Sequence, residues 1–286
     1  MPAASRQQPA DAPFDVESLE AIRDILDDPD NRLSRLYWII TKGDNDDDLV
    51  VRFVPNVVQQ RLVDRLWHRN LVLKARQRGI TTLIAILWLD TALFSPGPVY
   101  CGIIAHEREA AEEIFRTKVV FAYEHLPAWL KKEFPLEQKT ATELVFAHNG
   151  ATIRVATSMR SGTIHRLHVS ELGKIAAKYP FKAREVLTGS IPAVPASGVL
   201  VVESTAEGQD GAFYDLAQIA KETADSGRTL SEKDYRFHFF SWWDADEYEL
   251  PPDLVVITDQ DQEYFRRVES IIGRPISMRK RAWYVA

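Results

Sequence analysis

The 286-residue sequence has only one cysteine, Cys101, which excludes a framework of internal disulfide bonds. It also lacks the apolar N-terminal core of a signal peptide, because residues 1–15 are rich in Ala, Pro and Gln. The best candidate for a membrane span, residues 80–94, is interrupted by Asp90 and falls short of the about 20 apolar residues needed. We therefore expect a protein without membrane spans, a disordered segment over residues 1–15, and a buried helix over residues 80–94.

An excess of basic residues is missing too, since 35 Lys and Arg face 41 Asp and Glu, for a net charge of −6. This balance excludes a protein that wraps nucleic acid with an overall basic surface. It still allows a local basic patch that contacts phosphates. The acidic segment from Lys42 to Asp48 is interpreted as a solvated loop and not a metal site, because nothing orients its carboxylates.

Apolar strands and helical segments alternate along the middle of the chain. Strands are expected at 70–75, 99–106, 166–171, 198–204 and 235–243, a hairpin at 143–158 around His148-Asn149-Gly150, and helices at 81–94, 107–126, 181–187 and 212–224. This alternation predicts an α/β fold with a mainly parallel central sheet that helices cover on both faces.

The stretch LVLKARQRGITT, residues 71–82, predicts a strand, a phosphate-binding loop and a helix. Such a loop combines inward N–H groups, a helix N-terminus and a cation for the phosphates. The usual pattern places a lysine directly before the Ser/Thr, yet Ile80 stands there and Lys74 occupies the position of the first glycine. Lys74 could reach the phosphates from the end of the strand, and Thr81 could bind Mg²⁺. A basic turn before a buried helix fits these residues equally well.

The segment KARQRGITT resembles the loop of the large terminase subunits, the motors that package DNA into viral capsids. Some members of that family carry the lysine at the start of the loop, so the resemblance makes Lys74 the phosphate cation. It implies a P-loop NTPase of the ASCE type, a DNA-packaging motor that hydrolyses ATP with Mg²⁺. The nucleotide-binding residues that it implies in this loop are Lys74, Ala75, Arg76, Gln77, Arg78, Gly79, Ile80, Thr81 and Thr82, with Thr81 also on the metal.

The segment RLHVSELGK, residues 166–174, resembles the second motif of the family, an apolar strand that ends in Asp-Glu. In this motif the aspartate steadies a Mg²⁺-bound water, and the glutamate orients or deprotonates the attacking water. Here Glu171 takes the catalytic position, and Ser170 replaces the aspartate at the metal with a hydroxyl that supplies no charge. A second carboxylate from elsewhere is therefore expected, but the sequence does not identify it. The residues alone also allow Glu171 merely to cap the next helix.

The segment ATSMRSGTIHR, residues 156–166, matches the place where terminases carry an arginine in a Ser/Gly-rich loop. By this resemblance Arg160 is a catalytic arginine finger that acts on the nucleotide of a neighbouring subunit, with Arg166 as the weaker candidate. The alternative is an ordinary surface arginine.

Two more segments extend the resemblance. Ser204, Thr205 and Gly208 match the coupling motif of the family, where hydroxyls at a strand tip sense the γ-phosphate. Gln59, in FVPNVVQQRLVD, matches the glutamine that contacts adenine, with Gln60 as the alternative. A polar residue at a helix start remains the plainer interpretation of this glutamine.

The resemblance covers about residues 53–248, most of the chain. Family members continue into a nuclease domain, whereas this chain ends at SMRKRAWYVA. We therefore expect an ATPase domain over residues 16–250 and a linker, or the start of a nuclease domain, over residues 251–286. No DNA-cutting residues are assigned. The basic segment 278–283 could contact DNA phosphate, but a solvated linker is the favoured interpretation.

The partners that the resemblance implies are double-stranded DNA, a portal protein, a small terminase subunit and further copies of the chain. The copies would form a ring of five on the capsid, while the isolated domain would be a monomer. The expected location is the cytoplasm of the host cell, and transiently the portal of the procapsid. Two alternatives remain open: a helicase-like translocase, or a degenerate assembly scaffold in which Ile80 and Ser170 have abolished hydrolysis.

Overall fold

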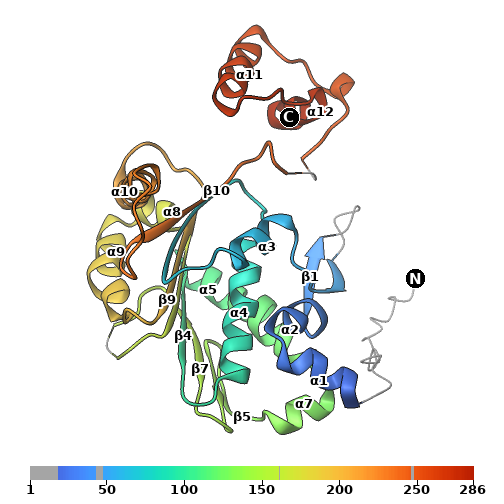
Figure 1. Cartoon of the computed structure of the whole chain (residues 1–286), viewed down its shortest axis with the longest axis vertical. Helices are drawn as coiled ribbons and strands as arrows, with labels where there is room; N and C mark the ends of the chain where they lie inside the picture. The colour runs from blue at the N-terminus through green and yellow to red at the C-terminus, as the bar shows by residue number, and fades with distance from the viewer. Residues whose placement is uncertain (1–18, 43–47, 161, 246–247) are drawn as a thin grey trace.

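The computed structural model describes residues 19–42, 48–160, 162–245 and 248–286 (Figure 1). The expected disordered segment, 1–15, lies outside the described residues, and so do residues 43–47 of the acidic segment. None of the described helices is long and apolar enough to cross a membrane.

The centre of the molecule is an eight-stranded sheet in the order β10-β3-β9-β8-β4-β7-β6-β5. Neighbouring strands from β10 to β7 run parallel, and the β7–β6 and β6–β5 pairs are antiparallel. The expected mainly parallel sheet and the hairpin at residues 143–158 are thereby confirmed. The strands are β3 (Arg69–Lys74), β4 (Tyr100–Ile104), β5 (Leu136–Lys139), β6 (Glu143–Phe146), β7 (Thr152–Ala156), β8 (Arg166–Ser170), β9 (Val199–Ser204) and β10 (Tyr235–Phe240).

Helices cover both faces of this sheet, as the sequence predicts (Figure 1). Side chains that alternate along β3 enter different apolar clusters: Val72 packs with α4 residues, and Leu71 packs with residues of α8 and α9. Such alternation is what a strand buried on both faces requires. The helices of the two layers are α3 (Val57–Val63), α4 (Ile80–Phe94), α5 (Arg108–Ile114), α6 (Phe121–Glu124), α7 (Ala128–Glu133), α8 (Leu172–Lys178), α9 (Pro180–Glu185) and α10 (Gly211–Asp225).

Helix α4 is the buried helix that the sequence predicts. It begins at Ile80, one residue earlier than expected, and ten of its fifteen residues are buried. Its apolar side chains face every direction, which is typical of a helix enclosed by protein. Because α4 follows β3 directly, its N-terminus is fixed beside the carboxyl end of that strand.

The helix expected at residues 107–126 is a continuous helical run of three parts. Helix α5 leads into a π-helical segment, Phe115–Val120, which passes into α6. A second π-helical segment, Val186–Ser190, follows α9 and is succeeded by a short 3-10 helix, Ile191–Ala193.

An N-terminal part precedes the sheet along the chain. Helices α1 (Leu19–Asp27) and α2 (Pro29–Arg35) are separated at Asp28, whose carboxylate accepts the Asp30 N–H at the start of α2. The strands β1 (Trp38–Lys42) and β2 (Asp48–Arg52) form a separate antiparallel pair.

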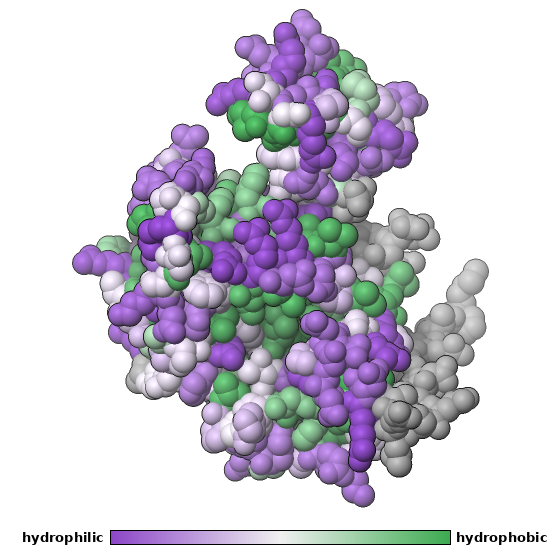
Figure 2. Space-filling view, viewed as in Figure 1, coloured by the Kyte–Doolittle hydropathy of each residue, from purple (hydrophilic) through white to green (hydrophobic). Residues whose placement is uncertain are grey.

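The C-terminal residues form a helical part that projects from the sheet region (Figure 1). It contains a 3-10 turn (Pro252–Leu254), α11 (Asp259–Ile272) and α12 (Met278–Val285), with a small apolar cluster around Phe265. Figure 2 shows mainly hydrophilic side chains on the visible face, with hydrophobic areas both over the sheet region and on the C-terminal part. The Trp283 ring stacks on Tyr248 at 3.7 Å between centroids, so this part contacts the segment that follows β10.

Candidate active site

The carboxyl ends of three parallel strands bring the predicted site residues together. Lys74, Ser170 and Ser204 are the last residues of β3, β8 and β9. Strand β9 lies between the other two, so its end separates the phosphate-loop strand from the strand that leads to Glu171. Ligand sites in open α/β sheets lie at this end of the strands.

Lys74 is buried, and its ammonium points to two carboxylates. Its Nζ lies 2.9 Å from Glu171 Oε1 and 3.0 Å from Glu203 Oε2. Burial alone would lower the pKa of this ammonium, but attraction to Glu203 and Glu171 outweighs burial and raises its pKa. Lys74 therefore stays charged and faces the site interior.

Glu171 adopts a left-handed backbone conformation, with φ of 57°. Among the described residues, it shares this feature with only one other non-glycine residue, Gln77 in the phosphate loop. Its side chain makes no capping hydrogen bond to α8. Instead Oε2 accepts from Thr205 N and Thr205 Oγ1, each at 3.2 Å, and from Ser204 Oγ at 3.3 Å. The interpretation of Glu171 as a mere helix cap therefore does not describe its contacts, and the uncommon backbone conformation turns its side chain toward the site.

A third acidic residue, Glu203, lies at the centre of the cluster. Its Oε1 accepts from Thr81 Oγ1 at 2.9 Å and from Ser170 Oγ at 2.8 Å. The sequence predicts a second carboxylate beside Ser170 without identifying it, and Glu203 lies in a stretch predicted only as an apolar strand. A glutamate within a strand predicted to be buried was the feature that could have indicated this site, because a fully buried glutamate is rare unless it is paired.

The charges of the cluster do not balance. One ammonium, on Lys74, and two carboxylates, on Glu171 and Glu203, leave a net charge of −1. His168 Nε2 lies 3.5 Å from Glu203 Oε1 and adds a positive charge only when protonated. Burial alone would raise the pKa of Glu203, but contact with His168 and the charge of Lys74 lower it, so this carboxylate stays ionised.

The other residues of the phosphate loop divide between the core and the surface. Ile80 is buried in the main apolar cluster, so the usual lysine position is not open to a charge. Arg76 and Gln77 are exposed, whereas Arg78 is buried with its guanidinium 5.5 Å from the centre of the Tyr248 ring. The Ala75 N–H donates to Phe240 O in the edge strand, and Tyr248 OH donates to Arg76 O. Thr82 follows Thr81 in the first turn of α4 and is partly buried.

Gln59 lies against the end of this loop. It forms a capping box with Asn56, whose N–H donates to Gln59 Oε1 at 2.9 Å, and its Nε2 donates to Gly79 O at 2.8 Å. Gly79 has a φ of 69°, and a Cβ there would stand 2.6 Å from Gln59 Nε2. The glutamine therefore braces the loop; a contact with adenine stays a prediction.

The predicted arginine finger pairs with a carboxylate that is not part of the cluster. Arg160 is mostly exposed after β7, and its Nε donates to Glu185 Oε1 at 2.7 Å. The weaker candidate, Arg166, begins β8 and so stands about 13 Å along the strand from Ser170. The role of either arginine on a neighbouring subunit stays a prediction.

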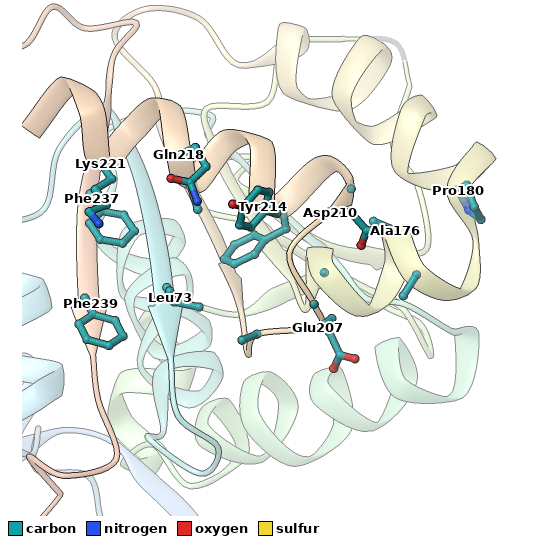
Figure 3. Close-up of a pocket in the computed structure, with 17 residues that line it drawn as sticks. Leu73, Ala176, Pro180, Glu207, Asp210, Tyr214, Gln218, Lys221, Phe237 and Phe239 are labelled. Atoms are coloured by element: carbon teal, nitrogen blue, oxygen red, sulfur yellow. The ribbon is translucent and has the colours of Figure 1, made fainter. Parts of the chain in front are cut away.

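An apolar pocket of about 670 Å³ adjoins the loop after β9, which contains Thr205 and Gly208 of the coupling motif. In Figure 3 Leu73 of β3 and Phe237 and Phe239 of β10 line one side of the pocket, with Tyr214 of α10 beside them. Glu207 borders the pocket and accepts from Thr205 Oγ1 at 3.4 Å. Because Lys74, Thr81 and Glu171 do not line it, this pocket is distinct from the charged cluster.

Metal binding would rely on few protein ligands. No group of three or more His, Cys, Asp or Glu residues suited to a metal occurs in the part of the chain that the structure describes. The cluster nevertheless offers the oxygen atoms of Thr81, Ser170 and Glu203, and oxygen is the donor that Mg²⁺ prefers. Mg²⁺ with a nucleotide is commonly held by one or two carboxylates, water and the phosphates, so these residues fit it.

Solved structures of known function share this arrangement of strands and helices. A mutant ATPase domain of the Thermus phage P74-26 large terminase matches 76% of this chain and 89% of its own, with 19% identity and a TM-score of 0.50. The large terminase of bacteriophage HK97 matches 87% of this chain, with 16% identity and a TM-score of 0.52. The chain has the fold of a phage large-terminase ATPase domain.

The expected P-loop fold of the ASCE type is thereby confirmed. This chain corresponds to 48% of the HK97 large terminase. No protein-family model matches the sequence, and no curated protein matches it. At such low identity the likeness concerns the fold, and the roles of individual residues are proposals.

Proposed function

We propose that this chain is an ATPase motor domain that hydrolyses ATP with Mg²⁺ to drive double-stranded viral DNA into a procapsid. The observation that carries the proposal is the convergence of Lys74, Thr81, Glu171 and the Ser204-Thr205 pair at one end of the parallel sheet. A cation, a hydroxyl at a helix start, a glutamate and a sensor pair are the parts that phosphoryl transfer to water uses.

Each part has a chemical task in this proposal. Lys74 and the N–H groups at the start of α4 bind the phosphates, helped by Arg76. Glu171 orients the attacking water and takes its proton. Thr81 would be one of the ligands of Mg²⁺, which when bound would supply positive charge against the phosphates.

The contacts of Glu171 offer a route by which a change in the bound nucleotide could be transmitted from the site to α10. Its Oε2 holds the Thr205 N–H and the Thr205 hydroxyl, and Thr205 Oγ1 also contacts Glu207 at the rim of the apolar pocket. A change at Glu171 during turnover would therefore reach the loop that leads to α10. This connection supports the proposed coupling role of Ser204 and Thr205.

The proposal includes the partners that the resemblance to terminases implies. They are double-stranded DNA, a portal protein, a small terminase subunit and neighbouring copies in a ring. Arg160, which is exposed and pairs with Glu185, would complete the site of the next copy. The isolated domain would then be a monomer with slow turnover.

The test is ATP turnover by the purified chain, followed as release of inorganic phosphate, with nucleotide binding measured in parallel. We expect Glu171→Gln to bind ATP normally but to lose about 100-fold or more in turnover, the usual range for a general base. Lys74→Ala should lose binding as well. The exposed residues Lys132 and Glu133 supply the controls, and Lys132→Ala and Glu133→Gln should behave as the wild type.

A wild-type chain that binds no ATP at millimolar concentration with Mg²⁺ would contradict the proposal and favour an assembly scaffold. Turnover that single-stranded DNA stimulates, and double-stranded DNA does not, would instead favour a helicase-like translocase.

A further inference from the structure

We propose that Glu203, from β9, supplies the carboxylate of the Mg²⁺ site that Ser170 lacks. This inference rests on the proposed nucleotide site, and it names a residue to which the sequence motifs give no role. In the usual motif the carboxylate stands at the end of the strand that corresponds to β8. Here it would stand at the neighbouring position on β9.

The position of Glu203 in the sheet supports this assignment. Ser170 and Glu203 are direct partners in the parallel pairing of β8 with β9. Adjacent strands lie about 4.8 Å apart, a separation that the extra methylene of glutamate and a change of side-chain direction can bridge. An acidic side chain on β9 can therefore reach the space that a shorter one on β8 would occupy.

The hydrogen bonds of Glu203 give the second argument. In P-loop enzymes the metal is held between the hydroxyl at the start of the loop helix and the acidic side chain. Glu203 Oε1 accepts from that hydroxyl, Thr81 Oγ1, at 2.9 Å, and from Ser170 Oγ at 2.8 Å. No other carboxylate contacts Thr81 in the described part of the chain, since Glu171 binds Lys74 and Thr205 instead.

Charge gives the third argument. Glu203 is completely buried, and Lys74 is shared between it and Glu171. Two carboxylates, Glu203 fully buried and Glu171 partly buried, face one ammonium, and with a neutral His168 they leave negative charge that a cation can balance. Glu203 stands in a mostly apolar strand, VLVVES, where a valine would avoid the cost of burying a carboxylate.

The experiment compares the affinity for a non-hydrolysable fluorescent ATP analogue in excess Mg²⁺ with that in EDTA. The ratio of the two dissociation constants measures the contribution of the metal and does not depend on turnover. We expect Glu203→Gln to reduce this ratio by about 10- to 100-fold, the range for losing a group that supports a bound metal. The matched variant Glu171→Gln also removes a carboxylate from Lys74 but should keep the ratio of the wild type.

A swapped variant guards against an effect that is only structural. In Ser170→Asp/Glu203→Ser the carboxylate returns to β8, and the Mg²⁺-dependent ratio should recover while Glu203→Ser alone stays low. This pair remains informative if Glu203→Gln does not fold, as checked by circular dichroism.

The outcomes separate the two proposals. A wild type that binds the analogue neither with Mg²⁺ nor in EDTA refutes the nucleotide site itself. A wild type with a clear Mg²⁺ effect that Glu203→Gln and Glu203→Ser both preserve refutes only the role of Glu203. Failure of the swapped variant to recover, although it folds and binds in EDTA, shows that Glu203 serves Lys74 and not the metal.

Discussion

In the part of the chain that the structure describes, two clusters of charged side chains around the buried residues Arg32 and Lys74 are built differently. In the first, Arg32 of α2 contacts Asp90 of α4 through two hydrogen bonds of 2.9 Å, and Tyr37 OH donates to the same carboxylate at 2.7 Å. One guanidinium meets one carboxylate, so the charges balance. A third hydrogen bond of this guanidinium runs from Arg32 Nη1 to Leu26 O at 2.6 Å.

The second cluster, around Lys74, has two carboxylates for one ammonium, and Glu171 adopts a left-handed backbone conformation. A balanced pair with satisfied donors joins α2 to α4 and needs nothing more. An unbalanced group on a strained backbone is stable only if something else favours it, and such groups concentrate at functional sites. The comparison therefore separates a structural cluster from a candidate active site without reference to any motif.

The largest expected effect is on the balanced cluster. Asp90→Ala leaves the buried Arg32 guanidinium without its carboxylate, which should reduce the free energy of unfolding by about 3–5 kcal/mol. Urea denaturation measures this loss. MgATP should stabilise the variant and the wild type by the same amount, so the difference between them should not change. The exposed pair Arg35–Asp24 is the control, and Asp24→Ala should cost less than about 1 kcal/mol. A loss below 1 kcal/mol for Asp90→Ala would show that the first cluster is not structural in this sense.

The second prediction concerns the pH dependence of stability. His238 belongs to neither charged cluster, so its contribution must be known before a pH effect is assigned to either one. His238 of β10 is buried near Arg65 and Arg236, and burial together with these charges lowers its pKa from 6.5 to about 3. Below pH 6.5 the unfolded chain binds a proton that the folded chain does not, so stability falls as pH falls toward 3. The loss between pH 6.5 and pH 4 is at most about 3 kcal/mol, from about 1.4 kcal/mol per pH unit.

The check is urea denaturation across this pH range for the wild type and His238→Gln. The variant keeps a donor for Asn70 Oδ1, which His238 Nε2 contacts at 3.1 Å. Its stability should depend less on pH below 6.5. Equal slopes would show that the acid response does not come from His238.

The sequence predicts the fold well because the signals are local. Runs such as VLVVES on β9, the Asn-Gly turn of the hairpin and the apolar helix after the loop each specify one element, and their order specifies a parallel sheet. The two C-terminal helices, α11 and α12, were not predicted, because the basic residues of this segment were interpreted as part of a linker. The spacing of Phe265, Val268 and Ile272 on α11 was a helical signal within the same segment.

The candidate site was predictable only in part. Lys74, Glu171 and Ser204 could be named because the segments at these strand ends resemble terminase motifs; the residues alone also allowed a basic turn at Lys74 and a helix cap at Glu171. Glu203 could not, because its role depends on which strand lies beside β8, and sequence order does not specify that neighbour. The contribution of Arg160 depends on another chain, so a single sequence predicts it only by resemblance.

The third prediction tests the brace at the phosphate loop. Gly79→Ala forces a side chain into a left-handed conformation and places its Cβ against Gln59 Nε2, so we expect a loss of about 1–3 kcal/mol. Gly97→Ala is the control, because a Cβ there has no neighbour within 4 Å, and its effect should be within about 0.5 kcal/mol. Urea denaturation measures both. Equal losses would mean that the loop conformation does not depend on this glycine.

The smallest expected effect returns to the unbalanced cluster. Glu171→Gln removes one of two negative charges near Lys74 and leaves a balanced Lys74–Glu203 pair, while the amide oxygen can still accept from Thr205. The free energy of unfolding in EDTA, without nucleotide, should therefore stay within about 1 kcal/mol of the wild type or rise slightly. Asp90→Asn, the same chemical change in the balanced cluster, is the matched comparison and should destabilise clearly. If Glu171→Gln costs as much as Asp90→Asn, the second cluster also serves folding, and its excess of negative charge no longer points to a bound cation.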